Sequence, residues 1–93
     1  MKLKICVNSS AYDTQYGGEQ IMEVALGEYV LDEIFRLNFF RLIVDDVIDG
    51  NVCLRIMEGA TAHYFVLNAQ DNVARFERET SIGWDEIEIT LII

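Results

Sequence analysis

The densest group of side chains able to do chemistry in this chain is a short acidic run. It comprises Asp45, Asp46, Asp49 and the glycine that follows them, Gly50. Calcium prefers carboxylate oxygens, but an EF-hand loop beginning at Asp45 would place Val47 third and Ile56 twelfth, where ligands are required. The run is therefore interpreted as a solvated turn, across which we expect Asp45 to pair with Arg55.

The single histidine, His63, and the two cysteines, Cys6 and Cys53, are the other candidate catalytic or metal-binding groups. A Cys/His zinc site requires four ligands, and the sequence has no CxxC or HxxxH spacing. General-base catalysis by the imidazole would require a nucleophile and an orienting group, and the spacing identifies neither. We therefore expect His63 to lie at a sheet surface, both thiols to be free, and the protein to be a non-enzyme without metal or cofactor.

Charge is the most distinctive property of the sequence. The 16 Asp and Glu residues oppose 7 Lys and Arg, which gives a formal net charge of −9 over 93 residues. A surface this acidic repels nucleic-acid phosphates and anionic membranes, and it attracts basic proteins. We therefore expect no direct binding to nucleic acid or to a membrane. The expected partner is a basic protein surface, such as that of a nucleic-acid-binding protein.

Acidic side chains held on a rigid scaffold can occupy a site that normally holds phosphates, and aromatic residues are enriched at binding hot spots. The residues expected to contact a partner are Asp45, Asp46, Asp49, Glu77, Glu79, Asp85, Glu86, Tyr12 and Tyr16. In size and charge, though in no motif, the chain is similar to anti-CRISPR proteins and to the immunity partners of nuclease toxins. The sequence therefore predicts a small acidic interaction protein, and in its sharper form an inhibitor that mimics nucleic acid. The competing explanation is that the acidic residues only keep a small protein in solution.

Length and composition predict one folded domain over residues 1–93, because 52% of the residues are apolar and no linker or repeat interrupts them. No segment approaches the roughly 20 apolar residues of a membrane span. The first residues contain too brief an apolar run for a signal peptide. Two cysteines are too few for a disulfide framework, so the expected location is the cytoplasm.

Apolar residues that alternate with polar ones predict β-strands along most of the chain. The predicted strands cover residues 2–8, about 20–26, 62–68, 73–78 and 86–93, and a loop is predicted over 9–18. In residues 28–37 the apolar spacing changes to that of a helix, and a single helix over 19–37 is the alternative. The last strand ends in a run of apolar residues that would be adhesive at a sheet edge, so we expect it inside the sheet.

The Asp49-Gly50 pair predicts the tip of a β-hairpin, for which two registers are considered. A two-residue turn places Val52, Leu54 and Ile56 opposite Val47, Asp45 and Ile43. A three-residue loop with a left-handed Gly50 places the same three residues opposite Asp46, Val44 and Leu42. The second register gathers more apolar side chains on one face, and we therefore prefer it.

These elements predict a mainly β fold, a small antiparallel β-sandwich or half-open barrel with at most one short helix. An α+β fold, with one helix packed on an antiparallel sheet, is the alternative. The strand faces turned away from the predicted core carry Cys6, Ile43, Cys53, Met57, Phe65 and Ile92. Because such a surface is too apolar for free exposure, we expect a helix, a second sheet or another subunit to cover part of it. The alternative function is therefore a structural or assembly subunit that forms a homo-oligomer through this apolar sheet face.

Overall fold

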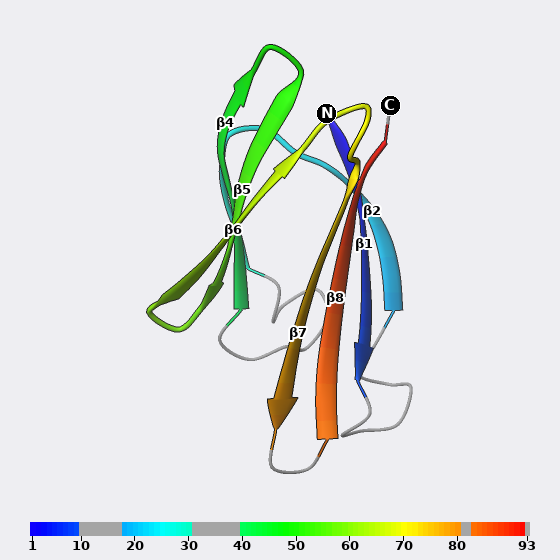
Figure 1. The fold of residues 1–93 in the computed structure, drawn as a ribbon, viewed down its shortest axis with the longest axis vertical. Helices are drawn as coiled ribbons and strands as arrows, with labels where there is room; N and C mark the ends of the chain where they lie inside the picture. The colour runs from blue at the N-terminus through cyan, green and yellow to red at the C-terminus, as the bar shows by residue number, and fades with distance from the viewer. Residues whose placement is uncertain (10–17, 31–39, 81–82, 93) are drawn as a thin grey trace.

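The computed structural model describes residues 1–9, 18–30, 40–80 and 83–92, and these ranges contain eight β-strands and no helix (Figure 1). The strands are β1 (Lys2–Ser9), β2 (Gly18–Glu23), β3 (Gly27–Val30), β4 (Phe40–Ile48), β5 (Asn51–Glu58), β6 (Thr61–Leu67), β7 (Val73–Thr80) and β8 (Gly83–Ile92). They form two antiparallel sheets of four strands each. The protein is therefore mainly β, with the architecture of a small β-sandwich, as the sequence predicted.

The strand order is β2-β1-β8-β7 in the first sheet and β3-β4-β5-β6 in the second. The chain passes from one sheet to the other between β2 and β3 and returns between β6 and β7 (Figure 1). β8 completes the first sheet by pairing antiparallel with β1, so that Lys2 lies opposite Ile92 and Ser9 opposite Asp85. The strand at residues 83–92 therefore lies inside the sheet, between β1 and β7, which confirms the prediction made for the apolar run near its end.

The core fills the space between the two sheets, because alternate side chains of each strand point inward. On β1, Leu3, Ile5 and Val7 are at most 1% exposed, which agrees with the alternation that predicted a strand over residues 2–8. The other fully buried large side chains are Phe40, Leu42, Val44, Leu54, Ile56, Leu67, Ile87 and Ile89. Phe40 of the second sheet meets Phe76 of the first edge to face, with ring centroids 5.7 Å apart. Each fully buried side chain of this kind contributes roughly 1.5–3 kcal/mol, so this layer is the main source of stability.

The tip of the β4–β5 hairpin is a two-residue turn. Asp49 and Gly50 both have positive φ, 52° and 81°, and Ile48 lies opposite Asn51. Positive φ at both central residues defines a type I′ turn, whose twist matches that of the flanking strands. The preferred three-residue loop is therefore wrong at the turn itself.

A β-bulge in β4 nevertheless restores the register that favoured the longer loop. Asp45 is an extra residue between the paired positions of β4, and beyond it Val44 lies opposite Leu54 and Leu42 opposite Ile56. Without the bulge, the two-residue turn would have put Asp45 opposite Leu54, on the face that is buried. The hairpin thus combines a two-residue turn with the apolar register of a three-residue one.

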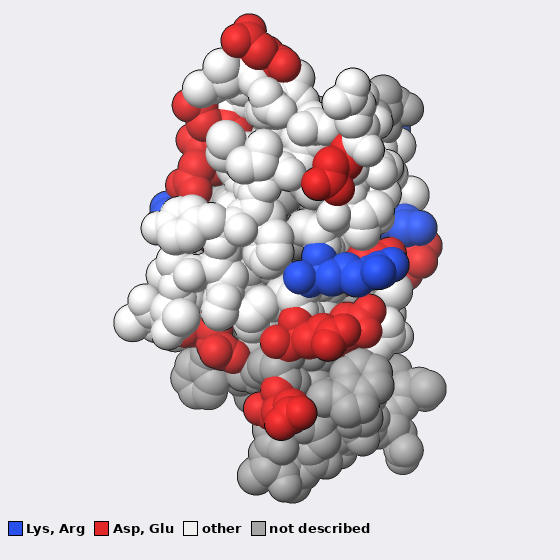
Figure 2. Space-filling model, in the orientation of Figure 1, with Lys and Arg blue, Asp and Glu red and all other residues white. Residues whose placement is uncertain are grey.

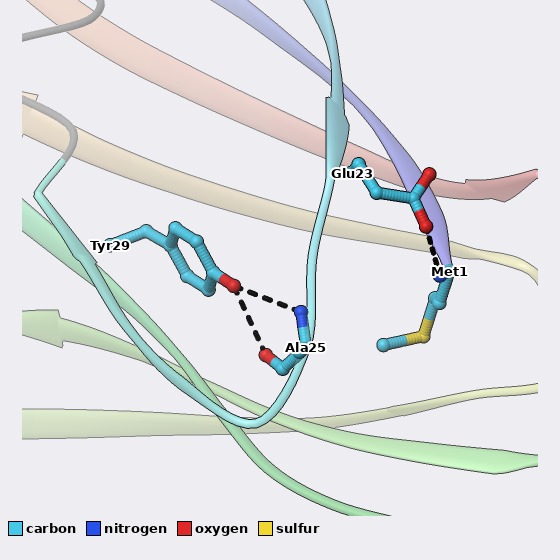
Figure 3. Close-up of polar contacts among 4 residues, drawn as sticks. All are labelled: Met1, Glu23, Ala25 and Tyr29. Carbon is cyan, nitrogen blue, oxygen red and sulfur yellow. Dashed lines mark hydrogen bonds and ion pairs between the residues drawn. The ribbon is translucent and has the colours of Figure 1, made fainter.

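Tyr29 fixes the point where the chain leaves the first sheet and enters the second (Figure 3). Its hydroxyl accepts a hydrogen bond from the backbone N–H of Ala25 at 2.9 Å and donates one to the backbone oxygen of Ala25 at 3.2 Å. The N–H of Val24, whose side chain is buried, donates to the backbone oxygen of Met1 at 2.8 Å. The N-terminal ammonium of Met1 donates to Oε1 of Glu23 at 2.6 Å. The crossing segment is therefore tied to β1 on one side and to β3 on the other.

The predicted helix over residues 28–37 is wrong in its first part. Gly27–Val30 form β3, which pairs antiparallel with β4, and residues 31–37 lie outside the described part of the chain. Aromatic and β-branched residues such as Tyr29 and Val30 suit a strand that packs on a neighbour, and this pairing overrides the local helical spacing. The predicted strand over about 20–26 ends at Glu23. The α+β alternative has no helix to support it in the described ranges.

Candidate partner-binding surface

β7 and β8 carry four carboxylates on the side of the first sheet that faces away from the core. Ile87 and Ile89 are buried on β8, so Glu86 and Glu88 point outward, and on β7 the residues on either side of buried Phe76 point outward too. We call the four acidic residues Glu77, Glu79, Glu86 and Glu88 the acidic face. Glu88 was not among the expected contact residues. Its spacing of two residues from Glu86 on one strand is the sequence signal that could have predicted both on the same face.

The register of β7 and β8 places Glu77 directly opposite Glu86, and Arg75 directly opposite Glu88. Nε of Arg75 donates a hydrogen bond to Oε2 of Glu88 at 2.9 Å. This hydrogen bond raises the pKa of Arg75, and the negative charges of Glu88, Glu86 and Glu77 raise it further. One guanidinium therefore lies in the field of three carboxylates.

The acidic face carries an excess of negative charge. Its four carboxylates oppose the guanidinium of Arg75, which leaves three negative charges among the described side chains of this face. Neighbouring strands lie about 5 Å apart and alternate residues of one strand about 7 Å apart, so these charges form a small grid. In Figure 2, blue and red atoms lie next to each other over the region of β7 and β8. Like charges directly opposite one another destabilise a sheet, so the pairing of Glu77 with Glu86 lowers the stability of the fold.

The second acidic group predicted from the sequence lies at the β4–β5 hairpin. Both carboxylate oxygens of Asp45 accept a hydrogen bond from Nε of Arg55, at 3.0 and 2.8 Å, which confirms the predicted pair. The hydrogen bond to Asp45 raises the pKa of Arg55. Oδ1 of Asp46 accepts from the backbone N–H of Val47 at 2.9 Å, and Asp49 is exposed at the tip. Two of the three carboxylates are thus engaged within the hairpin, so this group presents less free charge than the acidic face.

The two acidic groups lie far from each other. The tip of the β4–β5 hairpin is at one end of the long axis of the molecule, and the end of β7 and the start of β8 are at the other (Figure 1). In the same view, the acidic atoms form separate groups with uncharged surface between them (Figure 2). We therefore treat the hairpin tip and the acidic face as two separate candidate surfaces.

Three of the expected contact residues cannot be placed by their side chains. Asp85 belongs to β8, but its side chain lies outside the described part of the structure. Tyr12 and Tyr16 belong to the predicted loop over 9–18, of which the structure describes Ser9 in β1 and Gly18 in β2. Their contact with a partner stays a prediction.

His63 lies on the inner face of β6, so the expectation of a histidine at the sheet surface is wrong. Its ring packs against Phe76 of β7, with centroids 4.4 Å apart and an interplanar angle of 50°. Nε2 is buried and has no hydrogen-bond partner among the described residues. Phe65 and Leu67 share this inner face, which also corrects the placement of Phe65 on the outer one.

Cys6 and Cys53 are free thiols, as expected, and they lie on the outward faces of different sheets. Among the described residues, no group of three or more His, Cys, Asp or Glu side chains is arranged to hold a metal ion. No helix in the described ranges is long and apolar enough to cross a membrane. Comparison with known proteins found no matching family model, no matching curated protein and no matching solved structure.

Proposed function

We propose that the protein is a small, acidic, non-enzymatic interaction module whose acidic face binds a basic surface on another protein. The observation that carries this proposal is the direct opposition of Glu77 and Glu86 on β7 and β8. Solubility alone would be served equally well by acidic residues that do not oppose each other, and stability would be served better. A local arrangement that lowers stability is typical of a site selected for function.

The chemistry of the acidic face suits lysine and arginine side chains. Hydrogen bonds between a carboxylate and a guanidinium or ammonium are stronger than neutral ones, and arginine can bind a carboxylate with two parallel bonds. The net charge of −9 adds a long-range attraction that accelerates encounter with a basic partner. Because a grid of fixed negative charges presents what phosphates present, the partner we propose is a nucleic-acid-binding protein, which the bound module inhibits. The two free thiols suit a reducing compartment, and we place the protein in the cytoplasm.

Affinity capture at two ionic strengths tests the proposal. The immobilised protein is exposed to a lysate of its source at about 0.1 M and about 1 M salt, where the Debye length is about 10 and 3 Å. We expect basic proteins to be retained at the lower salt concentration, released at the higher one, and displaced by added duplex DNA. If no basic protein is retained in a salt-sensitive way, the proposal is wrong.

A pair of variants tests the location of the binding surface. Glu77→Gln, Glu79→Gln and Glu86→Gln together remove three negative charges from the acidic face, and we expect this variant to lose the captured proteins. Asp46→Asn, Asp49→Asn and Asp71→Asn remove the same number of charges elsewhere, and we expect this control variant to retain them. Equal losses in both variants would show that net charge alone, and no particular face, is responsible.

A further inference from the structure

β6 is an edge strand of the second sheet. It pairs with β5 along one side, and none of the other described strands pairs with its second side, because the nearby β7 belongs to the first sheet. The backbone N–H and C=O groups of every second residue of β6 therefore point away from β5. An edge of this kind is a template for pairing with another strand.

The side chains of β6 that face away from the core are apolar and exposed. Tyr64 is 72% exposed and Val66 is 53% exposed. Cys53 and Met57 of the neighbouring β5 are half-buried on the same outward face. The part of the surface that lies over β6 is accordingly uncharged in Figure 2. An additional strand along this edge would cover Tyr64 and Val66 from the side.

β6 also lacks the devices that usually protect an exposed edge, which are lysine, proline, a bulge or a very short strand. It has seven residues, Thr-Ala-His-Tyr-Phe-Val-Leu, and its register with β5 continues without a shift. The other three edge strands, β2, β3 and β7, each carry at least one acidic residue. In a chain of charge −9, β6 is therefore the edge where a second copy meets the least repulsion.

We infer that two copies of the protein pair antiparallel through β6, which joins their second sheets into one continuous sheet across a two-fold axis near Tyr64. In this arrangement the two Tyr64 rings are cross-strand neighbours, and Ala62 lies opposite Val66 of the second copy. A second copy suits the edge better than a basic partner does, because β6 offers no negative charge to attract one. The acidic face lies on the outer side of the first sheet and stays accessible in the dimer.

The affinity of dimerisation should change with salt in the direction opposite to the affinity for a basic protein. Two bodies of charge −9 repel each other. Salt screens this repulsion, so dimerisation strengthens between about 0.1 M and about 1 M salt, whereas binding to a basic protein weakens. The proposed dimer and the proposed binding of a basic protein can therefore be refuted independently of each other.

Sedimentation velocity across a dilution series tests the inference. We expect wild-type protein to dissociate on dilution and Tyr64→Glu to weaken the dimer by at least about tenfold, which corresponds to about 1.4 kcal/mol. The new carboxylates oppose each other across the two-fold axis, whereas within one chain each faces Arg55, which preserves the monomer. Ile21→Glu is the matched control, because Ile21 is exposed on β2 opposite Lys4, and we expect its dimer to persist.

A charge-complementation experiment locates the axis. Tyr64→Lys should also disrupt the dimer, and an equimolar mixture of Tyr64→Glu and Tyr64→Lys should restore it as a heterodimer. Hydrogen exchange of β6 amides should slow as the wild-type concentration rises. A wild-type protein that stays monomeric up to about 1 mM at both salt concentrations overturns the inference. So does a dimer that Tyr64→Glu leaves intact, or that Ile21→Glu disrupts equally, or a mixture that forms no heterodimer.

Discussion

Glu77 on β7 lies directly opposite Glu86 on β8, on a sheet face where the neighbouring cation, Arg75, is already paired with Glu88. Water and salt screen the repulsion between exposed carboxylates, which is why the sheet tolerates the arrangement. The pair nevertheless concentrates negative charge at the expense of strand pairing. Stability and partner binding are therefore expected to respond in opposite directions when this pair is changed.

Replacing Glu86 by Gln should raise the melting temperature by a few degrees, because it removes the repulsion with Glu77. A change of about 1 kcal/mol shifts the melting temperature of a domain this small by about 4–8 °C. The same variant should bind basic partners less tightly. Asp49→Asn, at the exposed hairpin tip, is the control and should change neither quantity. A lower melting temperature in Glu86→Gln, measured by thermal denaturation, would show that attraction to Arg75 outweighs the repulsion.

Replacing Tyr29 by Phe removes the hydroxyl that bonds to the N–H and the oxygen of Ala25. The free energy of unfolding should fall by about 0.5–1.5 kcal/mol, which is the usual net contribution of such a hydrogen bond. Urea unfolding measures it, with an unchanged m value as evidence that the folded state is intact. Tyr29→Ala should lose more, because the ring itself packs against the core. If Tyr29→Phe is as stable as wild type, Tyr29 does not hold the crossing between the sheets.

Replacing His63 by Leu should stabilise the protein by roughly 1 kcal/mol, because it removes a buried Nε2 that no described residue satisfies. Leucine is apolar, and the site lies against the ring of Phe76. His63→Gln keeps a polar group at the same position and should give no gain. Chemical denaturation of the three proteins decides the matter. A loss of stability in His63→Leu would mean that the imidazole makes a specific contribution to packing on Phe76.

The contact between Met1 and Glu23 should make stability sensitive to acid. The hydrogen bond from the N-terminal ammonium is the main cause that lowers the pKa of Glu23 below its ordinary value of 4.5, and the charges of the ammonium and of Lys2 add to it. Because the pKa is lower in the folded state, this contribution is present above about pH 4.5 and disappears as the pH falls through the lowered value. The difference in urea midpoint between wild type and Glu23→Gln should therefore vanish at low pH. A difference that persists in acid would refute this explanation.

Strand alternation in the sequence was sufficient to predict the fold class, because on strands such as β1 the buried residues recur with a period of two. Leu3, Ile5 and Val7 illustrate this most clearly. The helical spacing after Gly27 led to a wrong prediction, because β3 forms by pairing with β4. The spacing of residues within one segment carries no information about such a pairing. The bulge at Asp45 could not be predicted either. It allows a two-residue turn at Asp49-Gly50 and a buried position for Val44 in the same hairpin, and no local sequence signal marks it.

The sequence was sufficient to predict most of the acidic residues that belong to the candidate surface. It was not sufficient to predict how these residues lie relative to one another in the sheet. The pairing of Asp45 with Arg55 followed from the hairpin, whose two strands are adjacent in sequence. The opposition of Glu77 and Glu86 depends on the register of β7 and β8, which no signal in residues 81–82 specifies. The inward position of His63 depends on which face of β6 meets the other sheet, a property of the whole sandwich.

The pairing of β1 with β8 also has a consequence for biosynthesis. β1 pairs on one side with β2, which follows it in the chain, but on the other side it needs residues 85–92, whereas β3 to β6 pair with one another in chain order. Contacts that are close in sequence form faster than distant ones, so we expect the amides of β3–β6 to gain protection before those of β1 and β8 in pulse-labelled hydrogen exchange. Simultaneous protection would contradict this order. On the ribosome, the nascent chain would thus carry one complete sheet and an unfinished β1–β2 pair until β7 and β8 have been synthesised.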